Sequence, residues 1–351
     1  MATAAPVLSP DSWLVKTVRG RLVLLACAVG VIHLAAALLF WGGRGGVLTF
    51  GLLLTAYLAG VKHSYDWDHL AAIDNSTRKF VSEGRRPVSV GFAFSLGHST
   101  VVALAGALLV AGVHAVQGAI EEGNASNHVL GLIGAGVSGL YLLAMGLFNA
   151  RAALSVGRTL RSAHAGETVR EEDLRARGVV ARLIEAPLRH VRKPWHIYVV
   201  GFLFGLGFDT ASTVALLILT VSASAAGVSP LALLSLPAAF TAAMTLCDSL
   251  NGAAMMRLYD TALREPMRRL RFNLVITALS AVSALMISFI TLGGWLRELL
   301  GLEDPVTGWL ADVDLGDAGL LLAGSFLVIW LVWRLAQRPG QGRTAQPNPG
   351  S

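Results

Sequence analysis

The chain is dominated by long apolar runs that are separated by short polar segments. Eight of these runs are long enough to cross about 30 Å of hydrocarbon as helices. This pattern predicts an all-α integral membrane protein with one transmembrane domain over residues 1–333 and a disordered tail over 334–351. The expected spans are Leu22–Phe40, Gly46–Ile73, Val88–Val113, Val129–Phe148, Tyr198–Ala225, Pro230–Met256, Leu274–Leu292 and Gly319–Trp333.

The basic residues are distributed unevenly between the two ends of these spans. They concentrate before the first span, after the last span and in three loops, 74–87, 149–197 and 257–273. Only Arg44 and Arg297 fall in the alternate loops, and Lys62 lies inside a span. Because cytoplasmic loops carry the excess of Lys and Arg, this distribution predicts that both termini are cytoplasmic.

Composition changes the picture in one respect. Of 351 residues, 54% are hydrophobic and 14% are charged, which excludes an ordinary soluble domain. The net charge of +6 would suggest nucleic acid as a partner of a soluble protein. Here the basic residues report membrane topology instead, so we expect lipid contact and no nucleic-acid partner.

The longest loop, 149–197, is rich in Arg. Within it, Glu171–Val191 fits an amphipathic helix on the inner membrane surface and fits a solvated linker equally well. The loop contains only three histidines, so it is not a His-rich metal-sequestering tract.

Polar residues inside the predicted spans are the strongest functional signal, because a charged side chain at a span centre costs about 2.5–3.5 kcal/mol. Counted from the cytoplasmic end of each span at 1.5 Å per residue, the clusters in four spans all lie roughly 15 Å deep. A common level near the midplane is where secondary transporters bind an ion. The residues are His63, Asp66, Asp68 and His69 in the second span, His98 in the third, Asp209 and Thr210 in the fifth, and Asp248 and Asn251 in the sixth.

The residue types in the second span are typical of a transition-metal site. On a straight helix His63, Asp66 and His69 share an arc of about 120°, whereas Asp68 points elsewhere unless the helix unwinds locally. Imidazoles with a carboxylate suit Zn, Ni, Co and Fe better than Mg or Ca. We therefore predict metal ligation by this cluster and by His98. The acids of the fifth and sixth spans, with Thr210 and Asn251, are expected to line the pathway or to orient the histidines.

An internal repeat supports a transporter architecture. Gly91–Thr100 and Gly201–Thr210 share the pattern Gly-Phe-x-Phe-x-Leu-Gly-x-x-Thr. A weaker match joins Asp66-x-x-His69 to Asp248-x-x-Asn251. Matching spans around a polar centre predict a pseudo-symmetric repeat around a midplane metal site.

These motifs resemble the nickel/cobalt transporter family. The resemblance rests on His-x4-Asp-His at His63–His69, on Arg78-Lys79 with Gly84–Pro87, and on the motifs around His98 and Asp209. The chain differs at Thr213 and Asn251, where the family often has Glu or Gln and a second Asp. The resemblance implies a permease of the bacterial cytoplasmic membrane that takes up Ni²⁺, or also Co²⁺, as its substrate without any cofactor.

Three alternatives are weaker. An exporter of related architecture would carry a His-rich cytoplasmic loop, which this chain lacks. An intramembrane metalloenzyme would need a motif such as His-Glu-x-x-His, which is absent, so we expect no enzyme activity. A metal sensor would need a signalling domain. The chain contains no Gly-x4-Gly-Lys-Ser/Thr loop, so it implies no ATPase subunit.

Overall fold

A computed structural model describes residues 17–44, 47–112, 124–164, 191–207, 211–260, 266–313 and 318–336. Within these ranges the regular structure is helical, as predicted, and there is no strand. Three predicted features lie outside them: the tail from residue 337, nearly all of Glu171–Val191, and the pair Asp209 and Thr210. The last helix continues to Ala336, so it enters the region that the apolar pattern assigned to the tail.

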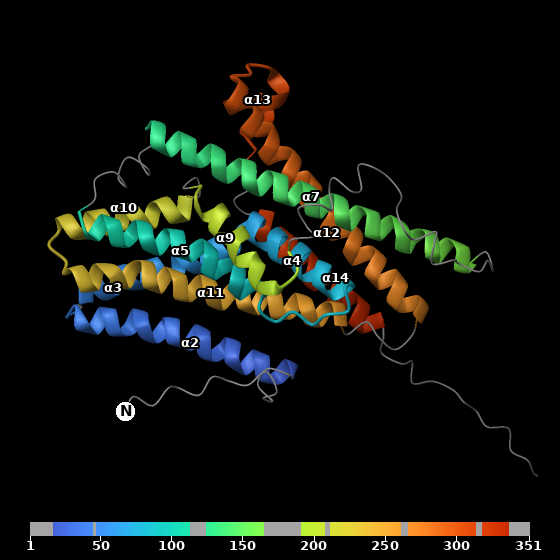
Figure 1. The fold of residues 1–351 in the computed structure, drawn as a ribbon, viewed down its shortest axis with the longest axis horizontal. Coiled ribbons are helices and arrows are strands. Elements are labelled where there is room, and N and C mark those ends of the chain that lie inside the picture. The colour runs from blue at the N-terminus through green and yellow to red at the C-terminus, as the bar shows by residue number, and fades with distance from the viewer. Residues whose placement is uncertain are drawn as a thin grey trace, which may run out of the picture.

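The helices form one elongated bundle (Figure 1). Five of those described are long and apolar enough to span a membrane, and they match the first, third, fourth, sixth and seventh predicted spans. Four of them extend beyond the predicted limits, whereas α5 begins two residues later than its predicted span, at Val90. α7 reaches His164, so part of the expected loop 149–197 is helical. The elements are α2 (Val18–Gly42), α3 (Val47–Ser64), α4 (Trp67–Ser82), α5 (Val90–Val110), α7 (Ala125–His164), η2 (Pro194–His196), α9 (Ile197–Gly205), α10 (Ala211–Ala225), α11 (Pro230–Asp260), α12 (Pro266–Leu300), α13 (Pro305–Ala311) and α14 (Ala318–Ala336).

The second predicted span is broken, so of the two possibilities that the sequence left open, a straight helix and local unwinding, the structure has the unwinding. α3 ends at Ser64, and α4 begins at Trp67 after Asp66, which has extended backbone angles (φ −61°, ψ 142°). The amides of Tyr65 and Asp66 donate to carbonyls three residues earlier, which tightens the last turn of α3. Ser and Asp favour helix ends over interiors. Gly319 of α14 packs directly on the Tyr65 carbonyl and leaves no room for a side chain at this break.

The fifth predicted span is also interrupted. α9 ends at Gly205 and α10 begins at Ala211, with residues 208–210 between them outside the described part of the chain. The two interruptions differ from the single continuous helices that hydropathy predicts. Apolar length alone does not distinguish a continuous span from two short helices in line.

The first copy of the sequence repeat lies on α5 and the second copy begins on α9, and these two helices pack against each other. Gly201 faces the Phe94 carbonyl, and Gly205 faces that of His98, so the two helices run parallel. α11 lies centrally, with contacts to α2, α3, α4 and α5, while α7 pairs with α12 at one side of the bundle (Figure 1). This packing holds the broken span and α5 against α11.

Close approach of α5 and α9 predicts that Gly201→Ala lowers stability. A Cβ atom there overlaps the Phe94 carbonyl oxygen, and overpacking costs about 1–3 kcal/mol. We expect a lower melting temperature in detergent. Gly131→Ala on α7 is the control, because nothing lies within 4 Å of a Cβ atom at that helical glycine. Equal melting temperatures for the two variants would contradict the packing argument.

Candidate metal centre

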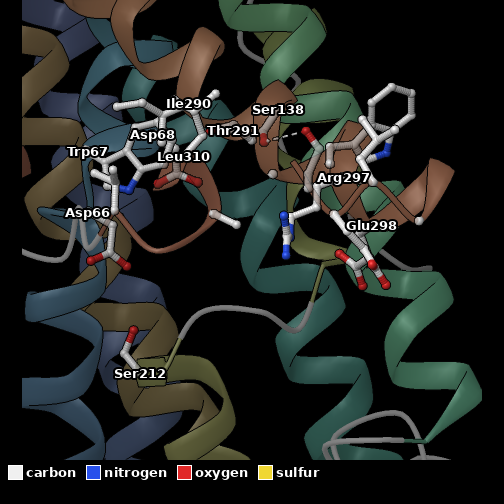
Figure 2. Close-up of a pocket in the computed structure, with 18 of the residues that line it drawn as sticks. Asp66, Trp67, Asp68, Ser138, Ser212, Ile290, Thr291, Arg297, Glu298 and Leu310 are labelled. Atoms are coloured by element: carbon white, nitrogen blue, oxygen red, sulfur yellow. Dashed lines mark hydrogen bonds between the residues drawn. The ribbon is translucent and has the colours of Figure 1, made fainter. Parts of the chain in front are cut away.

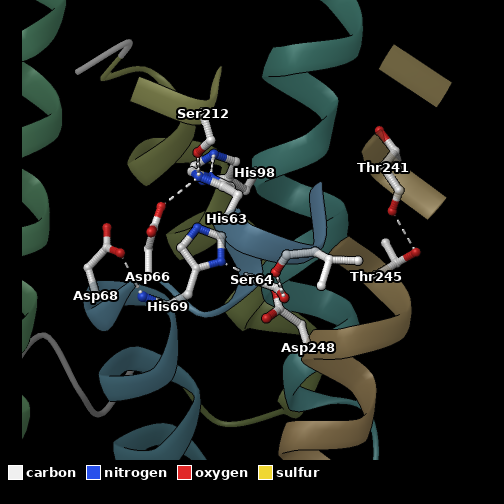
Figure 3. A network of polar contacts seen from close by, with 11 residues as sticks. His63, Ser64, Asp66, Asp68, His69, His98, Ser212, Thr241, Thr245 and Asp248 are labelled. Atoms are coloured by element: carbon white, nitrogen blue, oxygen red, sulfur yellow. Dashed lines mark hydrogen bonds and ion pairs between the residues drawn. The ribbon is translucent and has the colours of Figure 1, made fainter. Parts of the chain in front are cut away.

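Three histidines from three helices meet at the break in the second span. His63 is in the last turn of α3, His69 in the first turn of α4, and His98 in the middle of α5. Their side chains are buried, with exposed fractions of 1%, 0% and 3%. One nitrogen from each ring lies within 4.8 Å of the other two. The three rings are tilted or edge-on to one another, with centroids 4.5 to 4.7 Å apart. Figure 3 shows how they come together.

The helix break accounts for this convergence. His63 and His69 are six residues apart, and the extended backbone at Asp66 redirects the chain between them. The third ring comes from α5, held against α11 by Gly91, which packs on the Asp248 carbonyl. Local unwinding therefore brings together side chains that belong to separate turns.

The separation of two of these nitrogens is short enough for a shared metal ion. His63 Nε2 and His98 Nε2 are 2.9 Å apart, which also suits a hydrogen bond between two neutral rings. Two nitrogens that bind one metal at about 2.0–2.1 Å lie about 2.9 Å apart when the angle between the bonds is 90°, and about 3.4 Å apart when it is tetrahedral. This pair of nitrogens is therefore close enough to bind one metal ion together.

Polar partners orient two of the rings. His63 Nδ1 lies 2.8 Å from Asp66 Oδ2 and 2.9 Å from Ser212 Oγ. His69 Nδ1 lies 3.3 Å from Asp248 Oδ2. A carboxylate that accepts from one imidazole nitrogen leaves the other nitrogen as the metal ligand. His69 Nε2 is buried and has no hydrogen-bond partner, which is consistent with such a free ligand position.

The remaining predicted residues take different places. Asp66 contacts His63, whereas Asp68 is half-buried and its Oδ1 accepts from the His69 amide at 2.8 Å. Asp248 is fully buried beside His69. Asn251 is one turn further along α11, and its Nδ2 is buried without a partner. Asp209 and Thr210 lie outside the described residues.

Sequence reasoning missed Ser212. Its hydroxyl contacts His63 from the start of α10, a helix 149 residues away along the chain. The only available signal was its position two residues after the repeat motif that ends at Thr210. A small hydroxyl in an apolar helix normally bonds to its own backbone, so the sequence offered no reason to select this one.

A cavity of about 890 Å³ leads to the break from one side. At its inner end are Asp66, Asp68 and Ser212, and at the other end are Arg297 and Glu298 near the end of α12 (Figure 2). The charge pattern predicts that the end of α12 and α13 lie on the outer side of the membrane. The cavity therefore joins the predicted outer side to the residues around the histidines.

The other side of the site is closed by a polar network on α4. Residues 74–79 are each at most 8% exposed, although the sequence placed 74–87 in a cytoplasmic loop. The Asn149 amide donates to Asn75 Oδ1, Ser76 Oγ lies 2.6 Å from Tyr141 Oη, and Lys79 Nζ donates to the Val191 carbonyl at 2.9 Å. The loop prediction was wrong because these polar groups lie on a helix and find partners on α7 and at Val191, which hydropathy does not register.

Comparison with known proteins decides the family. A family model described as a high-affinity nickel-transport protein, NicO, matches residues 49–335. The chain belongs to this family. The resemblance drawn from the motifs is thereby confirmed, and so is the expectation of a transport protein rather than an enzyme.

Several relatives of this NicO-family chain cover nearly all of it. The nickel transporter NicT of Mycobacterium tuberculosis is 39% identical over 89% of this chain and 88% of its own length. The high-affinity nickel-transport protein NixA of Helicobacter pylori is 38% identical, over 88% and 95%. The cobalt transport protein NhlF of Rhodococcus rhodochrous is 34% identical, over 90% and 92%. No solved structure matches the chain.

Proposed function

We propose that this chain takes up Ni²⁺, with Co²⁺ as a second substrate, across the bacterial cytoplasmic membrane as a secondary transporter. The observation that carries the proposal is the buried cluster of His63, His69 and His98 at a helix break. The family match and the names of the relatives point to the same metals. Three imidazoles with carboxylate partners are suitable ligands for these ions.

The proposed topology has eight spans with both termini in the cytoplasm and the histidines near the midplane. Five long apolar helices supply five spans. The other three spans are formed by α3 with α4, by α9 with α10, and by α14. Irregular backbone at membrane depth is tolerated where it lines a cavity, and broken helices commonly form transporter ion sites.

The arrangement of the cavity suggests how an ion moves. Ni²⁺ enters from the outer side past Asp66 and Asp68, exchanges water for the three imidazoles, and leaves when the polar network on α4 opens toward the cytoplasm. Asp66 and Asp248 hold His63 and His69 in orientation during binding. An inside-negative potential favours entry by about 2.3 kcal/mol per charge per 100 mV, and twice that for a divalent ion.

Accumulation of radiolabelled nickel by cells that express the chain tests the proposal. We expect uptake that unlabelled cobalt inhibits more strongly than zinc does. Outward movement of preloaded nickel, with no accumulation, would instead support the related exporter.

The network on α4 makes a separate prediction. Asn149→Leu removes the donor to the buried Asn75 carbonyl oxygen, and an unpaired buried group costs about 1–3 kcal/mol. We expect the uptake rate to fall several-fold while Ni²⁺ binding in detergent changes little. Asn127→Leu, the same substitution at the outer end of α7, is the control. An unchanged rate at equal protein level would argue that the network takes no part in closure.

A further inference from the structure

Lys62 is a charged residue inside the second span that the proposed ligand set does not use. It precedes His63 in the last turn of α3. Its side chain is exposed and lines the cavity together with Asp66 and Asp68. Among the residues that the structure describes, no carboxylate lies within ion-pair distance of it. A cation at this depth costs about 2.5–3.5 kcal/mol on insertion scales, so its presence requires a reason.

The position of Lys62 differs from that of Arg297, the other cation of the cavity. Arg297 is near the outer end of α12, and its Nη1 donates to the Asp304 carbonyl at 3.2 Å. Lys62 lines the same cavity as Asp66 and Asp68, and it immediately precedes His63 in the sequence. A Ni²⁺ ion that reaches the imidazoles through this cavity therefore passes a positive charge.

We propose that the Lys62 ammonium is a built-in counter-charge that weakens the site for every cation. Three negative charges are present near the site when Asp66, Asp68 and Asp248 are ionised. The imidazoles are neutral when they bind metal. With Lys62 the local charge is −2, which one divalent ion neutralises. Without it, a bound divalent ion leaves one uncompensated negative charge that holds the ion in place.

This counter-charge lowers the occupancy of the site by every divalent cation, and the imidazoles decide which cation still binds. Its repulsion weakens Ni²⁺ and Mg²⁺ by a similar factor, because both carry the same charge. Ni²⁺ regains binding free energy from imidazole nitrogen, whereas Mg²⁺ prefers oxygen ligands and retains its water. The site therefore stays free of Mg²⁺, and it releases Ni²⁺ faster than a site without the lysine would.

The inference deepens the proposed function and rests on it. A different role for Lys62 is stabilisation of α3, because a cation in the last turn interacts favourably with the helix dipole. That role predicts a loss of stability with no gain in affinity. The two roles therefore change the Michaelis constant in different ways.

The experiment measures initial rates of nickel uptake by full-length protein in proteoliposomes at a fixed membrane potential. We expect Lys62→Met to lower the KM for Ni²⁺ and the kcat by about tenfold each, a size typical of one charge acting across a partly hydrated cavity. At Ni²⁺ concentrations well below both KM values, Mg²⁺ should inhibit this variant at about tenfold lower concentration than it inhibits the native protein. Lys62→Arg should keep native values, and Lys193→Met, outside the cavity, is the charge-matched control.

A KM that is unchanged or raised in Lys62→Met, with unchanged sensitivity to Mg²⁺, would overturn the counter-charge. Equilibrium binding of Ni²⁺ to detergent-solubilised Lys62→Met and Lys62→Gln needs no transport, and tighter binding is expected in both. Weaker or equal binding in both would also overturn the proposal. If the native protein accumulates no nickel, the proposed function fails instead, so the two failures are distinguishable.

Discussion

Replacement of His63, His69 or His98 by Ala abolishes nickel uptake while the protein still inserts into the membrane; this is the largest effect that we expect. Each ring contributes one of three buried nitrogens that lie within 4.8 Å of one another. Loss of one leaves two imidazoles, and the ion then retains water that the buried site cannot accommodate. Because even residues that only orient a ligand change metal affinity by about 10–100-fold, we expect a loss of about 100-fold or more.

Accumulation of radiolabelled nickel, normalised to the amount of protein in the membrane, measures this loss. His196→Ala is the matched control, because this ring stacks edge-on with Trp195 in η2 and is outside the cluster. The control should retain native uptake. Native uptake by any well-inserted variant of the three cluster histidines would show that its ring is not a ligand.

The second large effect is expected from Asp248→Asn. Asp248 is fully buried, and its Oδ2 lies 3.3 Å from His69 Nδ1. The amide keeps the shape of the side chain but removes the negative charge that fixes the ring and offsets the charge of the ion. We expect nickel affinity to fall by about 10–100-fold, with protein stability little changed.

Binding of Ni²⁺ to the purified variant in detergent, together with uptake in cells, tests this second effect. Asp312→Asn is the control, since this exposed acid ends α13 on the predicted outer side. Equal affinity in the two variants would mean that Asp248 does not act through His69. X-ray absorption by the bound nickel would report the nitrogen ligands independently of transport.

The interrupted helices show where sequence reasoning reached its limit. A hydropathy window over Gly46–Ile73 averages the apolar turns of α3 with the polar turns of α4, so it reports one span. The break depends on Gly319 of α14 packing against the Tyr65 carbonyl, a contact between residues far apart in the chain. The fully buried polar side chains of α4 were assigned to a loop for the same reason, because their partners lie on α7 and α12.

What the sequence alone determined was the helical class, the family, and the histidines that meet in the site, since apolar length, intramembrane charge and motif spacing are local properties of the chain. It grouped His63, His69 and His98, and the structure brings these rings together, while their role as metal ligands stays a prediction. Of the straight helix and the local unwinding that it considered, the structure has the unwinding. Only the tertiary structure decided which side chains orient these rings, because the bond from Ser212 to His63 and the pair of His69 with Asp248 join helices distant in sequence. The same holds for the cavity that exposes Lys62 beside Asp66 and Asp68. Residues from several helices line this cavity, so its shape depends on how those helices pack and cannot be read from any single segment.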